Sequence, residues 1–206
     1  AGLAFSKGGI VFLPAALFLL WEVNSSGLCS FLWGFLAVFV SHRWLLSLHP
    51  LDWIGIPIGL SLPLTVALWI FCSLLSGLFV FFWSFIGKLF SIYYQENSII
   101  SQFIFALLMS SLWGLGEVLL SHTPLFWIGL GETLIPYDLY LAGLSRVIGS
   151  GGIASILILM GWCIWRIKVY LINGYPWKRF FISTIIIYLF LHACGYFLLI
   201  PKEINS

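Results

Sequence analysis

The chain has 206 residues, of which 62% are hydrophobic and only 8% are charged, and its formal net charge is +2. A soluble domain carries about 25% charged residues, so this composition excludes a water-soluble fold at this length. Together with apolar runs of membrane-spanning length, it predicts an all-α, polytopic transmembrane helical bundle that forms a single domain over residues 1–206. The basic residues lie at helix ends, where they serve topology, so no nucleic-acid partner is expected.

Apolar runs predict six membrane crossings, preceded by the end of a truncated first helix that reads AGLAFS before Lys7. The expected helices are, in chain order, 9–22, 28–46, 59–92, 98–121, 152–172 and 180–200. The third would be roughly 50 Å long, which exceeds a hydrocarbon core of ~30 Å. It must therefore tilt, protrude or bend, and Gly77 beside Ser76 is the expected position of any bend.

Lysine and arginine predict the orientation. Alternating the sides puts Lys88, Arg166, Lys168, Lys178 and Arg179 on one face, and Lys7, Arg43, Arg146 and Lys202 on the other. Four of the first group cluster around the short hairpin NGYPWKR, the kind of loop in which positive charge most strongly favours the cytoplasm. We therefore expect this hairpin in the cytoplasm, and the C-terminus on the outer, periplasmic side.

Residues 122–151 separate the fourth and fifth apolar runs. They gather polar, aromatic, proline and glycine residues that a bilayer-spanning helix avoids. We expect an outward-facing loop here, and we expect any substrate to bind at it.

Glu117 lies near the outer end of the fourth apolar run. An ionisable group at membrane depth is costly and is a candidate functional residue by default. It either forms a polar bond that fixes helix packing or faces a substrate, and the sequence favours neither. Trp113, four residues earlier, lies on the same helical face, where packing or interface anchoring is the simpler interpretation.

Other polar residues of the segment have structural interpretations. Asp138 and Arg146 predict an ion pair that holds the loop, although Arg146 could instead bind a lipid phosphate. The GLGET stretch at Gly129 lacks the strand and lysine of a phosphate-binding loop, so its glycines are expected to let backbone approach backbone or to admit a lipid chain. His192 is interpreted as a hydrogen-bonded core histidine, since no second histidine follows at ligand spacing.

No metal site or cofactor is expected. Cys29, Cys72, Cys163 and Cys194 lie one per helix, with no C-x-x-C spacing and no nearby histidine pair. No Ser-His-Asp or Cys-His arrangement plausibly shares one water-exposed pocket. The chain alone therefore shows no complete catalytic constellation.

Two motifs carry a family resemblance. The first is W-x-x-x-E-x-L-L-x-x-T-P-L-F-W-I-G-L-G at 113–131, and the second is L-A-G-L-S-R-x-x-G-S-G-G at 141–152. Both resemble the membrane half of apolipoprotein N-acyltransferases, especially the cyanobacterial members. Such enzymes have eight transmembrane helices and a periplasmic nitrilase-like domain that enters after the seventh helix.

The resemblance implies an activity as well as a fold. Members transfer an acyl chain from a phospholipid donor to the N-terminal cysteine amine of a diacylated lipoprotein, using a Glu-Lys-Cys triad in the nitrilase-like domain. Because the chain stops at Ser206, none of its residues is expected to be catalytic. It is expected to form the lipid-access and substrate-binding floor in a bacterial inner membrane, with membrane lipids as its surroundings.

Several residues are predicted to bind lipid or substrate in this floor. By resemblance, Trp127 matches the tryptophan of the family's F-P-W-type loop, and Gly131 and Gly143 match its glycines. The full predicted set is Trp113, Glu117, Trp127, Gly131, Tyr137, Gly143 and Arg146. The alternatives are a non-catalytic membrane subunit, a truncated relative or a small transporter, for which paired discontinuous helices and several intramembrane charges would be expected.

Overall fold

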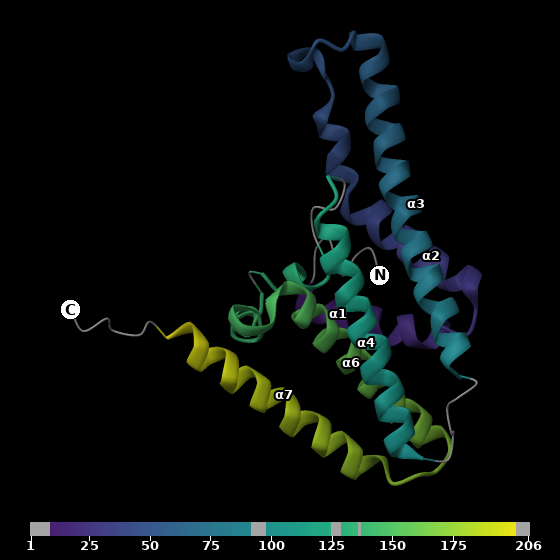
Figure 1. The fold of residues 1–206 in the computed structure, drawn as a ribbon, viewed down its shortest axis with the longest axis vertical. Helices are drawn as coiled ribbons and strands as arrows, with labels where there is room; N and C mark the ends of the chain where they lie inside the picture. Colours follow the sequence, from purple (N-terminus) through teal and green to yellow (C-terminus); the bar gives the residue numbers. More distant parts are fainter. Residues whose placement is uncertain (1–8, 92–97, 125–128, 136, 201–206) are drawn as a thin grey trace, which may run out of the picture. The chain divides into compact units, whose positions relative to one another are not determined.

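The structure is a computed structural model that describes residues 9–91, 98–124, 129–135 and 137–200. Within these ranges every regular element is a helix, and there is no strand (Figure 1). The predicted all-α class is therefore confirmed. The chain divides into two compact units, Ala1–Leu89 and Phe90–Ser206.

The first unit begins with two short apolar helices, α1 (Gly9–Val23) and α2 (Gly27–Ser41). The Ser26 side chain caps α2 by accepting a hydrogen bond from the backbone N–H of Cys29 at 3.4 Å. Two 3₁₀ turns follow, η2 (Arg43–Leu48) and η3 (Asp52–Ile54), before the long helix α3 (Ile58–Ser91). The helix expected over 28–46 is thus divided, because the chain tightens into 3₁₀ geometry at the polar end of α2.

Helices α2 and α3 are joined by side chains that donate to backbone carbonyls. The Trp69 indole N–H donates to the Phe39 carbonyl at 2.8 Å, and the Ser76 hydroxyl donates to the Gly34 carbonyl at 3.0 Å. Gly77 is buried against the ring of Phe31, and α3 runs on through it as one helix. The residue expected to permit a bend therefore provides close packing.

Four helices of the described chain are long and apolar enough to cross a membrane. They are α3, α4 (Ile99–Ser121), α6 (Ser145–Ile172) and α7 (Trp177–Leu199). Helices α1 and α2 have 15 residues each, a length of about 22 Å at ~1.5 Å per residue. The two further crossings predicted from the sequence therefore stay a prediction, and the N-terminal stub lies outside the described residues.

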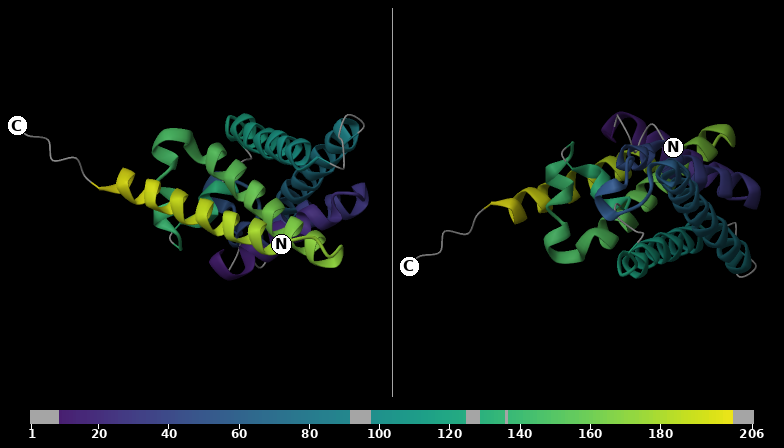
Figure 2. Two further views of the ribbon diagram at one scale, coloured as in Figure 1. Left: turned by 90° about the horizontal axis from the view of Figure 1, so that it is seen from below. Right: turned by 90° about the horizontal axis from the view of Figure 1, so that it is seen from above.

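The second unit is built on α4, α6 and α7. Helix α4 packs along α6, and α7 leaves the hairpin that follows α6 (Figure 1). Two short elements, η4 (Gly131–Leu134) and α5 (Leu139–Ala142), occupy part of the segment expected to be a loop. Helix α5 contacts both α6 and α7, and the further views show it beside the C-terminal half of α7 (Figure 2).

Small residues bring α4 and α6 into contact. A Cβ atom added to Gly151 would lie 2.7 Å from the Gly114 carbonyl oxygen, and one added to Gly114 would meet the Gly151 carbonyl and the Ser155 hydroxyl. Such close backbone approach is how helices pack where no water drives their association.

Helix α6 is interrupted one turn from its start. Gly149 has φ 68° and ψ 179°, a conformation essentially reserved for glycine. The regular part of α6 therefore starts just after this residue, close to the expected start at 152.

Candidate functional site

Glu117 is the buried link between α4 and the segment that follows it. Its side chain is only 7% exposed. Its Oε1 atom accepts two hydrogen bonds at 2.9 Å, one from the Trp113 indole N–H and one from the backbone N–H of Leu130. This geometry corresponds to the first interpretation of Glu117, a polar contact that fixes packing.

A second carboxylate lies close to the first. The Glu132 Oε2 atom accepts a hydrogen bond from the backbone N–H of Gly129 at 2.6 Å. A Cβ atom added to Gly129 would lie 2.6 Å from a Glu117 oxygen and 2.7 Å from a Glu132 oxygen. A side chain at position 129 would therefore collide with both carboxylate groups, and glycine avoids this collision.

Gly131 and Gly143 both permit close backbone contacts. Gly131 lies against the Ser150 carbonyl at the start of α6, and Gly143 lies against the Gly195 carbonyl of α7. Gly195 in turn lies against the Tyr140 carbonyl of α5. The backbone-approach interpretation of these glycines is thus confirmed at Gly131, and the same explanation applies to Gly143.

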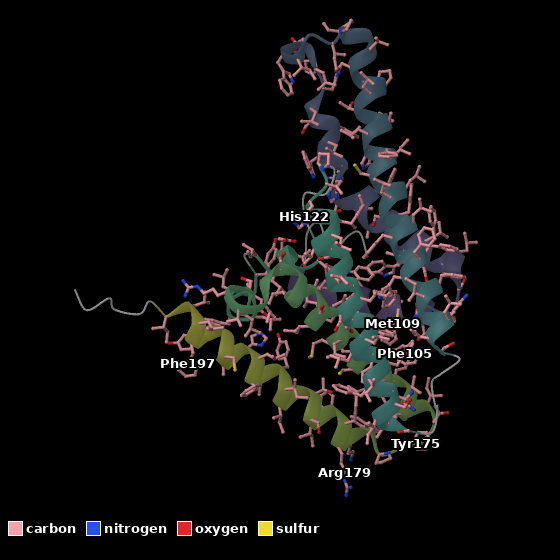
Figure 3. The ribbon with its side chains drawn as sticks, in the orientation of Figure 1. Phe105, Met109, His122, Tyr175, Arg179 and Phe197 are labelled. Atoms are coloured by element: carbon pink, nitrogen blue, oxygen red, sulfur yellow. The ribbon has the colours of Figure 1, made fainter. Side chains whose placement is uncertain are left out.

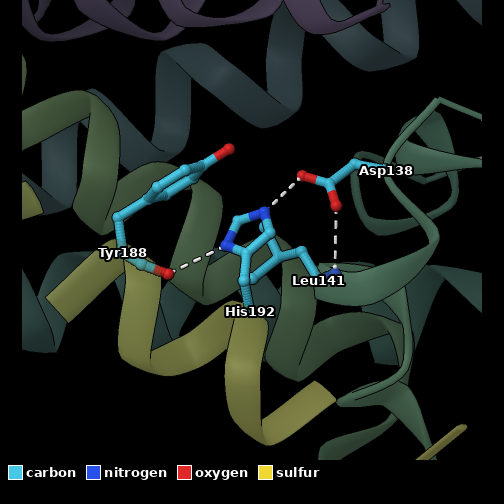
Figure 4. Close-up of polar contacts among 4 residues, drawn as sticks. All are labelled: Asp138, Leu141, Tyr188 and His192. Carbon is cyan, nitrogen blue, oxygen red and sulfur yellow. Dashed lines mark hydrogen bonds and ion pairs between the residues drawn. The ribbon is translucent and has the colours of Figure 1, made fainter. Parts of the chain in front are cut away.

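Asp138 fastens α5 to α7 (Figure 4). Its Oδ1 atom caps α5 by accepting from the backbone N–H of Leu141 at 3.1 Å, and its Oδ2 atom lies 2.8 Å from Nε2 of His192. Nδ1 of His192 lies 2.8 Å from the Tyr188 carbonyl oxygen. A carbonyl can only accept, so Nδ1 carries a proton, and a further proton must lie between His192 and Asp138.

Arg146 is placed differently from the expectation. Instead of pairing with Asp138, its Nη1 atom donates to the Leu198 carbonyl in the last turn of α7. The final carbonyls of a helix lack partners within the helix, so a guanidinium group suits this position. The predicted Asp138–Arg146 ion pair is therefore wrong, and His192 takes the place of Arg146.

The predicted site residues separate into two groups. Trp113, Glu117, Gly131 and Gly143 are buried in the contacts described above, whereas Tyr137 is 55% exposed and Arg146 is also exposed. Trp127 lies outside the described residues. Among the predicted residues that the structure describes, Tyr137 and Arg146 are therefore the two that a ligand could reach without displacing packed groups.

These contacts hold parts of the chain in place. Within the described ranges, no group of three histidine, cysteine or acidic residues could hold a metal ion. The four cysteines are free thiols, and Cys72 and Cys163 are buried. The buried polar contacts instead hold residues 129–148 against α4, α6 and α7, with one exposed side of that segment available for binding.

The chain has extensive similarity to curated proteins. It is 42% identical over 207 aligned positions to proteins named "Apolipoprotein N-acyltransferase" from two strains of Prochlorococcus marinus, and each match covers 100% of this chain and 42% of the relative. A protein of the same name from Parasynechococcus marenigrum is 42% identical over 167 positions, which cover 81% of this chain and 35% of the relative.

The other two comparisons gave no match, since neither a protein-family model nor a solved structure is similar to the chain. The chain spans about two fifths of the length of the curated relatives that it matches. Over its whole length, the chain is therefore a homologue of part of the apolipoprotein N-acyltransferases.

Proposed function

We propose that the chain is the membrane portion of an apolipoprotein N-acyltransferase in a bacterial inner membrane. Such an enzyme moves an acyl chain from a phospholipid to the N-terminal cysteine amine of a diacylated lipoprotein. The observation that carries the proposal is the 42% identity to two such proteins along the entire chain. Four helices of membrane-spanning length support it.

Residues 129–148 would form the lipid-access and substrate-binding floor. Leu134, Asp138 and Leu141 are buried and anchor this segment, whereas Ile135 and Tyr137 between them are exposed. Leu139 and Tyr140 extend the exposed apolar side, and Arg146 adds an exposed guanidinium group. An apolar surface beside a guanidinium suits a phospholipid, because acyl chains need apolar contact and phosphate binds guanidinium in a bidentate way.

The orientation follows from charge. With the basic hairpin between α6 and α7 in the cytoplasm, the opposite ends of α4, α6 and α7 face the periplasm. Residues 129–148 then lie at the outer surface, where the acyl donor and the lipoprotein would be brought to a catalytic group hosted by another part of the enzyme.

A chimera tests this function. The matching two fifths of a Prochlorococcus relative would be replaced by this chain, and N-acylation of a diacylated lipoprotein in isolated membranes would be measured by mass spectrometry. We expect the chimera to acylate the lipoprotein, and the 206-residue chain alone to give no product. A chimera that inserts stably and remains inactive would count against the proposal.

A pair of variants tests the floor separately. In the active chimera, Tyr137→Ser together with Arg146→Gln should lower acylation at limiting phospholipid, because both exposed contacts are removed. Arg43→Gln removes an exposed arginine in the other unit and should leave acylation unchanged. An equal loss of acylation in the double variant and in Arg43→Gln would show that the effect does not come from the floor.

A further inference from the structure

The hairpin between α6 and α7 is flanked by four basic residues and contains no acidic residue. Arg166, Lys168, Lys178 and Arg179 lie within fourteen residues, and no aspartate or glutamate occurs anywhere between Ser145 and Ile200. The two helices that carry these cations therefore supply no carboxylate to neutralise them.

Aromatic contacts bring Arg166 close to the start of α7. Its guanidinium carbon lies 5.0 Å from the centroid of the Tyr170 ring. The Tyr170 ring lies 5.5 Å from that of Phe180 in the first turn of α7, and 5.7 Å from that of Tyr175 in the hairpin. The Arg166 side chain on α6 is thus connected through one tyrosine ring to the aromatic residues at the start of α7.

Arg166 also has a hydrogen-bonding group without a partner. Its Nε atom is buried and makes no hydrogen bond to any described residue. An unsatisfied buried N–H costs free energy that a ligand oxygen would recover. Arginine pairs with phosphate through its planar fork of donors, so an anionic oxygen is the natural partner.

The first turn of α7 also favours a nearby anion. Helix α7 begins at Trp177 without a side-chain cap, and the exposed residues Lys178 and Arg179 lie in its first turn. Figure 3 shows Arg179 extending away from the ribbon at this end of α7, with Tyr175 nearby in the hairpin. Cations are unfavourable at a helix N-terminus, which carries partial positive charge, unless an anion lies close by.

We propose that this hairpin binds the phosphate group of an anionic phospholipid in the leaflet that it faces. The hairpin joins two helices of membrane-spanning length, so it lies at the level of the headgroups. Trp177 and Tyr175 are residue types that favour this layer, and basic groups between transmembrane helices bind anionic headgroups. This site lies at the end of the helices opposite to the proposed floor, and it does not depend on acyl transfer.

The test uses the full chain in detergent, with lipid retention measured by native mass spectrometry after addition of phosphatidylglycerol or phosphatidylcholine. We expect saturable retention of phosphatidylglycerol and little retention of phosphatidylcholine. Arg179→Gln should weaken phosphatidylglycerol binding about fivefold, and Lys178→Gln with Arg179→Gln more than tenfold, because each cation near a headgroup contributes a similar attraction. Arg166→Lys, which keeps the charge and loses the fork, should also weaken binding.

Arg43→Gln serves as the control, because it removes one exposed positive charge from η2, outside the hairpin. It should leave phosphatidylglycerol retention unchanged. Equal retention of the two lipids would overturn the proposal, as would an equal loss in Arg43→Gln and Arg179→Gln. Since Arg179 is exposed, as Arg43 is, unchanged binding in Arg179→Gln would also overturn it.

Discussion

Glu117 shows how one carboxylate oxygen can organise a helix end. Its Oε1 atom accepts from both Trp113 and Leu130. In Glu117→Leu, two buried donors lose their acceptor, and we expect the free energy of unfolding to fall by about 2–4 kcal/mol. Equilibrium unfolding in mixed micelles, followed by tryptophan fluorescence, would measure this change.

Glu117→Gln provides the matched control for that measurement. The amide keeps an oxygen that can accept from the same two donors, so the loss should be less than half of that in Glu117→Leu. Equal losses in the two variants would mean that the stabilisation does not come from this acceptor.

The contact between Asp138 and His192 predicts strong energetic coupling. Asp138→Asn keeps an oxygen for the α5 cap, and His192→Ala removes the ring that contacts Oδ2. In a double-mutant cycle of unfolding free energies, we expect a coupling of about 1–3 kcal/mol, since the two side chains share one part-buried hydrogen bond.

Arg146 supplies the comparison for that cycle. Because Arg146 donates to the Leu198 carbonyl and not to Asp138, Asp138→Asn and Arg146→Gln should be additive within about 0.5 kcal/mol. Strong coupling of Asp138 to Arg146, together with weak coupling of Asp138 to His192, would instead support the Asp138–Arg146 ion pair expected from the sequence.

For single residues, the sequence identified the important polar side chains better than it identified the residues that they contact. Glu117 and Trp113 were associated correctly, because residues four apart share a helix face whatever the fold. Leu130 as a partner of Glu117, and His192 as a partner of Asp138, were missed. The latter two lie 54 positions apart in the chain, and no local pattern relates them.

At the scale of elements, Gly149 determines where α6 becomes regular. Its φ of 68° and ψ of 179° suit glycine alone, and an added Cβ atom would meet nothing within 4 Å. Gly149→Ala should therefore lower the free energy of unfolding by about 1–3 kcal/mol through backbone strain without any clash. The same unfolding assay would measure this.

Gly59 is the matched control, since it also has open space around it but lies in the regular helix α3. Gly59→Ala should be neutral or stabilise by up to about 1 kcal/mol, because alanine is the better helix former. If both substitutions had the same effect, backbone strain at Gly149 would not be its cause.

The segment 122–151 was predicted as a loop because it gathers polar, aromatic, proline and glycine residues that a bilayer-spanning helix avoids. The structure instead contains η4, α5 and the first turn of α6 within it. Elements of about one turn are unstable alone and leave almost no periodic signal. They form here because Asp138 caps α5 and because Gly131 and Gly143 allow contacts with α6 and α7.

For the whole molecule, the predicted topology of six membrane crossings can be tested directly. Six crossings place Ser25 and Asn173 in the cytoplasm, and Asp52 and Tyr137 outside. Single cysteines at these four exposed positions, in a variant without native cysteines, would be tested with a membrane-impermeant thiol reagent in intact cells and in opened membranes. We expect labelling in intact cells only at 52 and 137.

Two labelling patterns would contradict this topology. If positions 25 and 52 were labelled from the same side, α2 would not cross the membrane. If 25 and 173 were labelled from outside while 52 and 137 were not, the orientation inferred from the basic hairpin would be reversed. Either result would leave the four long helices as candidate spans and would change only their connection or direction.

The sequence alone determined the helical membrane class, the approximate long helices and the resemblance to N-acyltransferases. Hydrophobic length and the spacing of residues on one helix are local properties, so they can be read before any fold is known. The tertiary structure decided which groups meet: Asp138 with His192, Arg146 with Leu198, and the glycines with carbonyls of other elements. These contacts join residues distant in the chain, and they exist only because packing brings their helices together.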